Sequence, residues 1–419
     1  MRKITLGMVS LALLALGCDI EDTANESLKN GVQEINLTGS YGDAATLNRE
    51  VVVYYKDGTT AQEKEAIRMA YGIEDIKTCT CADEHLELWK FGEDVPQGEI
   101  EEIIGTAQTE HDLEGTSFNK VFKLDENDID AFSQINDPHL GLNLRVTENT
   151  GVTIAVLDTG IMYDYEGFTA PLLYNSTIGS GSGGGQQPLF GWNFVEGNNN
   201  PYDDYHGKHG TVVSHILSSR LQQNNIPFQI LPIKVADSHG RVSYFDVLCG
   251  FRYAVQNGDV DIINMSFGWN GFGNDLLQQF IEESQEEVLI VCSAGNAGSN
   301  NDDIPHYPSS YTFGNIIATA SLCDIRQLRD QSKGLLASFS NYGALSVDLA
   351  APGENLPFSI QGTTHTMNGT SYAAAFMSYM AARYHTEGIS PIDLKNLIVS
   401  QSQYHPMLED VLFSSFVYE

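Results

Sequence analysis

The distribution of apolar and polar residues divides the chain into two parts, and the first part covers residues 46–125. Val51–Tyr55 is predicted as a strand because it is rich in β-branched and aromatic residues. Thr60 and Glu63 form a capping box, which predicts a helix that continues to about Tyr71. The pattern then predicts a strand, a second strand, a helix and a last strand, at residues 76–81, 85–91, 98–109 and 116–124. This βαββαβ order predicts a small α+β domain of ferredoxin-like topology.

The second part, residues 136–405, alternates apolar strands with helical stretches. Val152–Leu157 is a continuous apolar run, which is typical of a strand that is buried on both faces of a parallel sheet. Gly179–Gly185 reads GSGSGGG and predicts a flexible loop that interrupts this part. The alternation predicts an α/β domain with a mostly parallel central sheet flanked by helices.

The first residues have the pattern of an export signal. Arg2 and Lys3 precede an apolar run that is too short to span a bilayer, and this run ends in Leu-Ala-Leu-Gly before Cys18. The sequence resembles the lipobox of bacterial lipoproteins, in which the cysteine is acylated and becomes the first residue. We therefore expect a lipoprotein signal peptide at 1–17, a lipidated Cys18 and a polar tether over 18–45. The alternative is an ordinary signal peptide with a chance cysteine.

Composition narrows the class of partner. The chain of 419 residues has 55 acidic and 22 basic side chains, which gives a net charge of −33. Such a surface repels phosphate backbones, so nucleic acid is not expected as a partner. The hydrophobic fraction of 42% excludes a wholly disordered chain.

The six cysteines are too few for a disulfide scaffold in a chain of this length. A CxxC pair is missing from the sequence, so a structural zinc site has no support. Cys79 and Cys81 stand two residues apart, and this spacing is compatible with a disulfide between them or with a metal contact. We expect two separate strand thiols at these positions.

Two of the four motifs that carry chemistry supply a carboxylate and an imidazole. Asp158 follows the buried run in an Asp-Thr-Gly motif, at the end of a strand where doubly wound sheets place their sites. Taken alone it is also consistent with an aspartate that caps a turn. His209 precedes Gly and Thr at the expected start of a helix. A metal pair of His206 and His209 is the weaker interpretation, because their spacing differs from that of HExxH.

The other two motifs supply a hydroxyl and an amide. Ser371 follows Gly-Thr and opens an alanine-rich run that predicts a helix buried on all sides. The positive end of such a helix favours the loss of the hydroxyl proton, although an N-cap serine is the alternative. Asn296 ends the apolar strand that begins at Leu289, and its amide can donate to a developing oxyanion.

The four motifs occur in the chain order Asp, His, Asn, Ser, which places the catalytic triad in the subtilisin order. Over about residues 136–400 the chain resembles the subtilisin-like serine proteases, the subtilase family (peptidase S8). The resemblance implies that Asp158 orients the imidazole, His209 is the general base, and Ser371 is the nucleophile. It implies that Asn296 and the Ser371 backbone N–H bind the oxyanion.

The resemblance also implies a substrate cleft. One wall would be Ser266, Phe267 and Gly268, which would pair with an extended peptide. The opposite wall of the S1 pocket, which holds the residue before the scissile bond, would be Ser293, Ala294 and Gly295. Subtilases commonly carry a propeptide of the βαββαβ topology, so residues 46–125 are expected to be an inhibitory propeptide. Maturation cleavage is expected within 124–137, which would release the catalytic domain from its lipid anchor. Either the anchor then holds only the inhibitor, or the two domains stay associated non-covalently.

Two departures from the family pattern, and the expected cofactors, complete the comparison. Ala375 stands where the family usually has proline, and we expect Ser371 to be slightly retracted. Trp269 stands where glycine is usual, and we expect its ring near the S1 rim. The expected catalysis needs no cofactor. Structural calcium stays open, with Asp203-Asp204 and Asp302-Asp303 considered, and no metal ligand is assigned.

The sequence therefore predicts a serine endopeptidase that is anchored by lipid in the cell envelope and made as a self-inhibited zymogen. Its expected partners are a polypeptide substrate, its own propeptide and a membrane. Two alternatives remain. One is a catalytically silent surface binding lipoprotein, and the other is a dedicated maturation protease for one secreted peptide.

Overall fold

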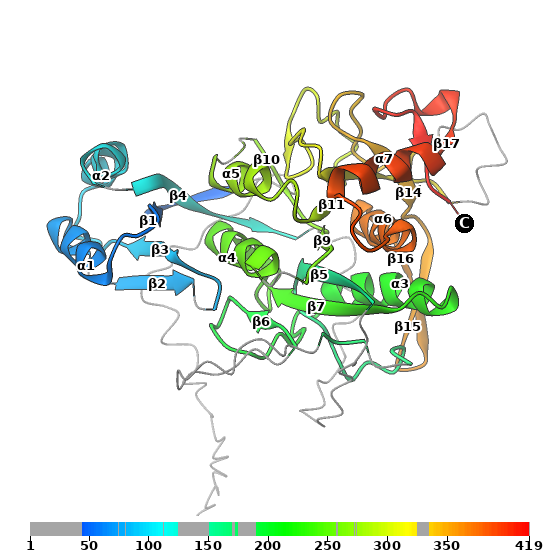
Figure 1. The fold of residues 1–419 in the computed structure, drawn as a ribbon, viewed down its shortest axis with the longest axis horizontal. Helices are drawn as coiled ribbons and strands as arrows, with labels where there is room; N and C mark the ends of the chain where they lie inside the picture. The colour runs from blue at the N-terminus through cyan, green and yellow to red at the C-terminus, as the bar shows by residue number, and fades with distance from the viewer. Residues whose placement is uncertain are drawn as a thin grey trace, which may run out of the picture. The chain divides into compact units, whose positions relative to one another are not determined.

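The computed structural model describes residues 44–124, 151–174, 190–256, 259–324 and 335–418, apart from residues 74, 80, 112, 170, 171, 272 and 274. Within these ranges the chain forms a small N-terminal α+β domain and a larger α/β domain, which are drawn in Figure 1.

The N-terminal domain has the predicted βαββαβ order. Its elements are β1 (Ala45–Tyr55), α1 (Ala61–Ala70), β2 (Asp75–Cys79), β3 (Asp83–Lys90), α2 (Gln97–Glu110) and β4 (Leu113–Lys123). The Thr60 hydroxyl accepts from the Glu63 N–H and the Glu63 carboxylate accepts from the Thr60 N–H, so the capping box is present. The sheet order is β2-β3-β1-β4-β8, in which β8 (Arg241–Ser243) belongs to the larger domain.

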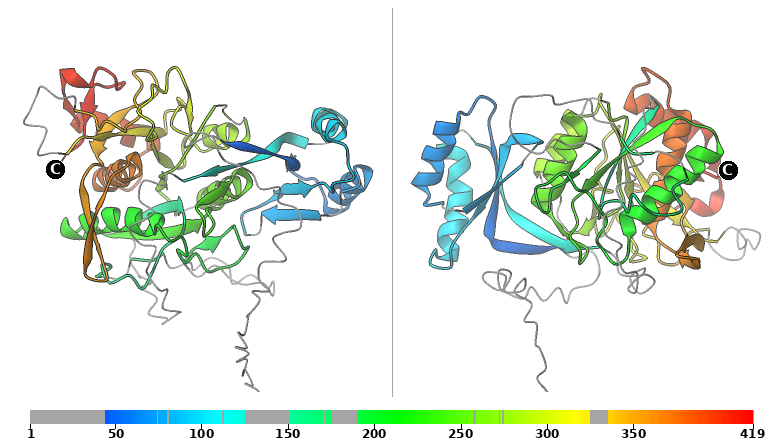
Figure 2. Two further views of the ribbon diagram at one scale, coloured as in Figure 1. Left: turned by 180° about the vertical axis from the view of Figure 1, so that it is seen from behind. Right: turned by 90° about the horizontal axis from the view of Figure 1, so that it is seen from below.

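Each face of this N-terminal sheet packs against different helices, as the views in Figures 1 and 2 show. Val51, Val53 and Trp89 point to one face and pack under α1 and α2. Val52 and Leu88 point to the other face and join an apolar cluster with α4 (Tyr244–Gln256) and α5 (Asp275–Glu283) of the larger domain. The alternation along β1 and β3 therefore buries both faces of the sheet.

The larger domain is built on a nine-stranded sheet in the order β17-β18-β14-β13-β11-β9-β5-β7-β6. Apart from the antiparallel pair β17–β18 its pairings are parallel. The nine strands are β5 (Val152–Asp158), β6 (Trp192–Asn193), β7 (Phe228–Lys234), β9 (Ile262–Met265), β11 (Leu289–Ser293), β13 (Ile316–Leu322), β14 (Leu349–Pro352), β17 (Gln403–Tyr404) and β18 (Ser415–Phe416). This is the predicted fold class.

Four short strands lie outside the two larger sheets and form two antiparallel pairs: β10 (Trp269–Asn270) with β12 (His306–Tyr307), and β15 (Leu356–Ile360) with β16 (Thr363–Met367). The remaining helices are α3 (His209–Gln223), α6 (Thr370–Tyr384), α7 (Pro391–Gln401) and the 3₁₀ turn η3 (Pro406–Leu408).

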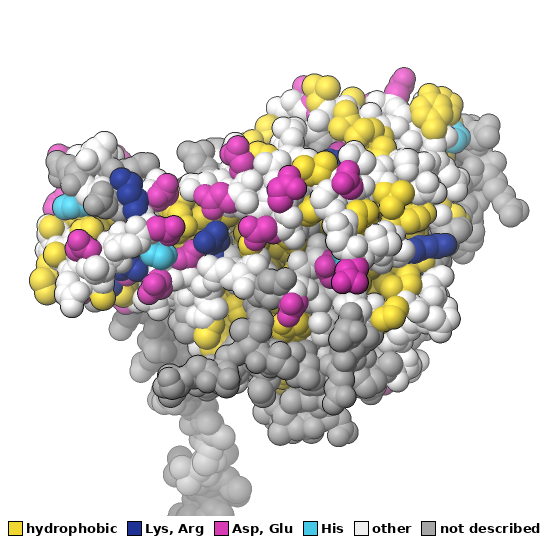
Figure 3. All heavy atoms as spheres, in the orientation of Figure 1, with side chains coloured by type: hydrophobic (Ala, Val, Ile, Leu, Met, Phe, Trp, Pro, Cys, Tyr) yellow, Lys and Arg dark blue, Asp and Glu magenta, His cyan; other side chains and the backbone are white. Residues whose placement is uncertain are grey.

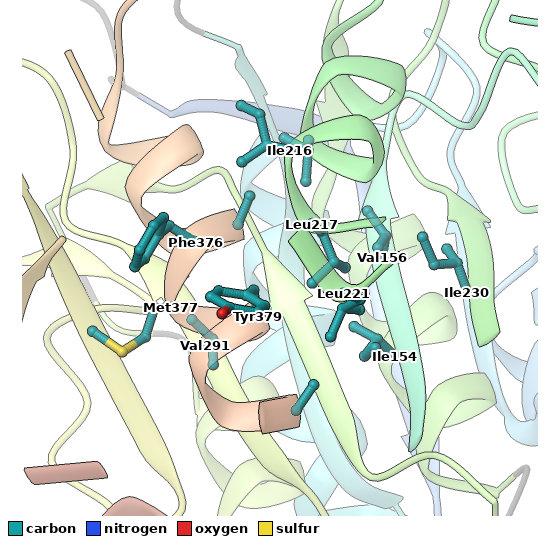
Figure 4. Packing of buried hydrophobic residues seen from close by; sticks show 14 of the residues in the cluster. Ile154, Val156, Ile216, Leu217, Leu221, Ile230, Val291, Phe376, Met377 and Tyr379 are labelled. Atoms are coloured by element: carbon teal, nitrogen blue, oxygen red, sulfur yellow. The ribbon is translucent and has the colours of Figure 1, made fainter. Parts of the chain in front are cut away.

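Helices α3 and α6 cover one face of the central sheet, and α4 and α5 cover the other. Ile154 and Val156 of β5 point toward α3 and α6, whereas Ala155 and Leu157 point toward α4. Figure 4 shows side chains of α3 and α6 meeting those of the sheet. Almost every residue of α6 is buried, as its alanine-rich sequence predicted.

The surface agrees with the composition. Acidic side chains are spread over the face shown in Figure 3 and do not gather in one patch. Within the described residues, every helix is too short or too polar to cross a bilayer.

Candidate active site

Asp158 and His209 form the first half of the site. Asp158 is the last residue of β5 and is fully buried, and His209 is the first residue of α3. The Nδ1 atom of His209 lies 2.8 Å from Oδ1 of Asp158. The same carboxylate oxygen accepts from the Thr159 N–H at 2.7 Å, so the carboxylate is held by its own backbone turn. This hydrogen bond leaves Nε2 as the ring nitrogen that can exchange a proton with a substrate.

The helix that carries His209 begins at a buried carboxylate from the loop just before it. Asp203 is fully buried, and its Oδ2 accepts from the Thr211 N–H at 3.0 Å and from the Thr211 hydroxyl at 2.7 Å. Burial raises the pKa of Asp203, and Lys208 and Lys234 oppose this shift. Asp203 thus caps the first turn of α3, a role that an acidic residue shortly before the His-Gly-Thr motif could have indicated.

Ser371 stands in the first turn of α6, on the opposite side of the site. Its Oγ donates to the carbonyl oxygen of Ser266 at 2.8 Å, and its side chain is buried except for a small exposed fraction. Ser266 is tied to the same turn, because its own hydroxyl lies 2.9 Å from the Ser371 carbonyl oxygen. The serine hydroxyl is therefore held against the cleft wall at the positive end of a buried helix.

The amide of Asn296 is oriented by Thr370. The Asn296 Oδ1 accepts from the Thr370 N–H at 2.8 Å and from the Thr370 hydroxyl at 2.9 Å. Because the oxygen is occupied, the NH₂ group turns toward Gly369, where a Cβ atom would stand 3.7 Å from it. The amide is thus presented as a donor beside the backbone that precedes Ser371. The role of Thr370 was not predicted from the sequence, although this residue is part of the Gly-Thr-Ser motif.

These groups lie along one cleft. Its lining includes His209, Ser371 and Asn296, together with the expected wall residues Ser266, Phe267, Gly268, Ser293 and Gly295. Ala294 is fully buried in a small apolar cluster with residues such as Ala320 and Leu322, so its side chain packs behind the wall. Strand β11 explains this difference, because alternate residues at its end point to opposite sides.

His306, which was not predicted as a site residue, forms part of the cleft lining. Its imidazole packs directly on Gly268 and Gly295, and a Cβ added at Gly268 would lie 2.2 Å from the ring. The His306 Nδ1 lies 2.8 Å from the hydroxyl of Ser309. Burial lowers the pKa of His306 to about 4, so the ring is neutral at physiological pH.

The end of the N-terminal domain occupies the cleft. Strand β4 pairs antiparallel with β8, and Phe122 stands opposite Val242. The Leu124 N–H donates to the carbonyl oxygen of Gly240 at 2.9 Å, and Lys123 and Leu124 line the cleft beside His209 and Ser371. We expected Ser266–Gly268 to pair with an extended peptide. These residues line the cleft, and the strand that pairs with β4 is Arg241–Ser243, which has three residues and is too short to recognise by its pattern.

Trp269 corrects another expectation. Its ring is buried and packs 5.0 Å from Phe122 of the N-terminal domain and 5.8 Å from Tyr244, measured between ring centroids. The prediction of a ring at the S1 rim was wrong, because β10 turns the side chain toward the apolar cluster under β4. Ala375 is fully buried inside α6.

Cys79 corrects the expectation of two separate strand thiols. Its sulfur is bonded to that of Cys249 on α4, whereas Cys81 is a free, exposed thiol. A bond between residues 170 positions apart depends on how the two domains meet, which local sequence does not reveal.

The acidic pairs considered for calcium have protein partners. Asp204 is paired with Lys234 at 2.8 Å, and Asp302 accepts from Ser346 at 2.7 Å. A group of three or more His, Cys, Asp or Glu side chains suited to a metal is not found among the described residues. Cys18, Gly179–Gly185 and the segment expected to be cleaved after Leu124 lie outside the described residues.

The comparisons with known proteins agree on one family. The model of the subtilase family (Peptidase S8) matches residues 149–413. The chain is 26% identical over 396 residues to a thermophilic serine proteinase of Bacillus sp. (strain AK1), covering 90% of this chain and 88% of the relative. It is 29% identical over 259 residues to thermitase of Thermoactinomyces vulgaris, covering 60% of this chain and 81% of thermitase.

A solved structure shows the same fold. The epidermin leader peptide processing serine protease from Staphylococcus aureus superimposes with a TM-score of 0.58 at 17% identity, covering 87% of this chain and 95% of that one. Because the family model matches more than half of the sequence, the conclusion is direct. This chain belongs to the subtilase family and is a subtilisin-like serine endopeptidase that acts on polypeptides.

Proposed function

We propose that the protein is a lipid-anchored endopeptidase of the cell envelope, made as a zymogen that its own N-terminal domain inhibits. In the proposed reaction, the Ser371 hydroxyl leaves the Ser266 carbonyl and attacks the substrate carbonyl carbon. His209 takes the hydroxyl proton on Nε2 and later gives it to the leaving amine. Asp158 holds the imidazole in orientation through Nδ1 and stabilises its charge. The reaction uses no cofactor.

Oxyanion binding is assigned to Asn296 and the backbone N–H of Ser371. The observation that supports Asn296 is the pair of hydrogen bonds from Thr370, which fixes the amide oxygen and leaves the NH₂ group to donate. A donor that is fixed before the reaction needs no reorganisation when the negative charge develops. Loss of such a donor typically costs about 10²–10³ in kcat.

The zymogen proposal is supported by the position of β4, whose end lies in the cleft. An extended strand already pairs with Arg241–Ser243 and brings Leu124 beside Ser371, so a substrate cannot lie there at the same time. A substrate would bind as this strand does, through main-chain hydrogen bonds to β8. Its side chain at the Phe122 position would contact Phe267 and Trp269, which favours an aromatic residue there.

The decisive experiment compares residues 18–419 of the wild type with Ser371→Ala. We expect the wild type to shed about a hundred residues by self-cleavage in segment 124–137, because an active nucleophile is present, whereas Ser371→Ala stays whole. The sizes and N-termini are measured by mass spectrometry, and the nucleophile by a fluorophosphonate probe. If the wild type stays whole and the probe does not react, the silent binding lipoprotein becomes the better interpretation.

The anchor is tested separately. We propose that Cys18 is acylated, which would hold the protein at a membrane without a spanning helix. Cells that express the full chain with Cys18→Ser should release the protein into the soluble fraction and should lose incorporation of an alkyne-labelled fatty acid. Cys81→Ser is the matched control, because it removes an exposed thiol without touching the signal. Retention of label in Cys18→Ser would contradict the proposal.

A further inference from the structure

A disulfide bond joins the N-terminal domain to the catalytic domain. Cys79 ends β2 of the N-terminal domain, and Cys249 lies in the middle of α4. Their Cα atoms are 5.4 Å apart, within the usual range for bonded cysteines. The bond closes a loop over 170 positions, and this loop includes Asp158, His209 and the segment where maturation cleavage is expected.

Two ion pairs flank the disulfide on the same face of α4. The Lys77 Nζ lies 2.6 Å from the buried carboxylate of Asp246, and the Arg252 Nε lies 2.8 Å from Asp83. Asp246, Cys249 and Arg252 are spaced by three residues, so they lie in one row along the helix. Their partners come from β2 and the start of β3. Three consecutive contacts therefore hold the two domains in one register, and the disulfide is the middle one.

The disulfide is protected by burial. Cys249 is fully buried and Cys79 is 4% exposed, inside the apolar cluster that the two domains share. Thiol exchange requires in-line approach of a thiolate to one sulfur, so its rate depends on access to the bond. Access requires that β2 and α4 separate first, and the flanking ion pairs oppose that separation. The bond thus behaves as a lasting cross-link while the domains are docked.

We propose that this bond keeps the two domains covalently joined after maturation, so that the mature enzyme is a two-chain protein. The inference rests on the maturation cleavage proposed above. A single cut in segment 124–137 lies inside the loop that the bond closes, so it opens the loop without dividing the molecule. The chain that carries Cys18 stays attached to the catalytic chain. The catalytic domain is therefore retained at the membrane, and the inhibitor remains at hand to reoccupy the cleft.

Formation of the Cys79–Cys249 bond requires an oxidant, which we assign to the cell envelope. The Cys79 and Cys249 thiols together lose two protons and two electrons as the sulfur–sulfur bond forms. A disulfide-bearing oxidoreductase accepts them, and its own disulfide becomes two thiols. Secreted and envelope proteins form disulfides in such compartments, which agrees with the predicted export signal.

The test is gel mobility of the processed full chain with and without reductant, after free thiols are blocked. We expect the processed wild type to run as one species without reductant and as two fragments with it. Cys249→Ser and, from the other side of the bond, Cys79→Ser should give two fragments in both conditions, a complete loss of the joined species. Cys81→Ser should behave as the wild type does, because Cys81 is exposed and outside the bond.

A second measurement tests whether the disulfide keeps the inhibitor attached to the catalytic domain. Fluorophosphonate labelling of the processed wild type should not change when the protein is diluted a hundredfold, because an attached inhibitor rebinds intramolecularly. In Cys249→Ser and Cys79→Ser the labelling rate should rise on dilution as the inhibitor dissociates. Separate fragments in the unreduced wild type, or alkylation of Cys79 before reduction, would overturn the inference.

Failure of self-cleavage is distinguished by a third chain. In Ser371→Ala, a thrombin recognition sequence is inserted between Glu126 and Asn127, and added thrombin makes the cut. If the wild type does not process itself but the fragments of this chain stay joined until reduction, the zymogen proposal fails while the cross-link stands. If the fragments separate without reductant, the cross-link fails whatever makes the cut.

Discussion

The two faces of the N-terminal sheet are both apolar, but they are covered by different parts of the molecule. The outer face, with Val53 and Trp89, is covered by the domain's own helices α1 and α2. The inner face, with Val52 and Leu88, is covered by α4 and α5 of the catalytic domain. The domain therefore covers one face with its own helices, and the other face is covered only when the domain docks on α4 and α5. Undocking would expose the inner face to water, which favours the closed cleft.

The largest effect is expected at the buried ion pair of the inner face. In the Ser371→Ala chain, Lys77→Met leaves the Asp246 carboxylate buried without its cation and should destabilise docking by ~3–5 kcal/mol. The double variant Lys77→Met/Asp246→Leu should recover most of that loss, because neither charge is left. Hydrogen exchange of the β4 and β8 amides measures the opening. Lys90→Met, which breaks a more exposed pair with Asp75, should change it by less than about 1 kcal/mol.

A matched pair of truncations separates the two faces. Ile100 packs in the outer core and Leu86 packs in the inner cluster, and both are fully buried. Each change to alanine should cost ~2–5 kcal/mol. Ile100→Ala should lower hydrogen-exchange protection throughout β1 and β3, whereas Leu86→Ala should act mainly on β4, β8 and α4. Equal exchange patterns for the two variants would contradict the division between the faces.

Acid should destabilise the catalytic domain through His306. Its pKa in the fold is about 4, below the ordinary value of 6.5, because burial disfavours the charged ring. The neutral ring's contribution to stability is complete above pH 6.5 and is lost as the pH falls through 4, by up to about 3 kcal/mol. His306→Asn should therefore flatten the fall in melting temperature between pH 6.5 and 4. The exposed His239→Asn is the control, and a parallel fall in both variants would exclude His306 as the cause.

The smallest effect is expected at the start of α1 on the outer face. Thr60→Ala removes the hydroxyl that accepts from Glu63 and should destabilise the helix by about 1 kcal/mol. Thermal unfolding of the N-terminal domain in the Ser371→Ala chain measures it. Docking of the inner face, read from the β4 and β8 amides, should stay unchanged. Thr60→Ser keeps the hydroxyl and should restore most of the stability.

Much of the architecture could be predicted from local sequence. The capping box at Thr60 and the period-two strands predicted the N-terminal domain, and the apolar run before Asp158 predicted a strand buried on both faces. These features depend on neighbours within a few residues, so they can be read along the chain. The grouping of Asp158 with His209 came from the order of motifs, and the structure gives it as a 2.8 Å contact.

Most of the contacts that the sequence did not reveal are long-range: His306 packs on Gly268, and Cys79 bonds to Cys249. Asp203 is the exception, because it caps a helix that starts only six residues later. Strand β8 is three residues long and is recognisable only by its pairing with β4. Trp269 was misplaced because its ring direction depends on the domain that docks over it. Such contacts follow from how distant segments meet, which pattern and propensity do not encode.

The packing of His306 against two glycines limits how the cleft can be redesigned. A methyl group at Gly268 would stand 2.2 Å from the imidazole, and one at Gly295 would stand 3.1 Å from it. The first would also stand 2.5 Å from the backbone carbonyl oxygen of Tyr307, and the second 2.5 Å from the amide nitrogen of Asn341, at a φ of +104°. Exchanging the histidine for a smaller residue therefore does not make room at either glycine, so both positions have to stay fixed while new cleft shapes are sought at neighbouring residues.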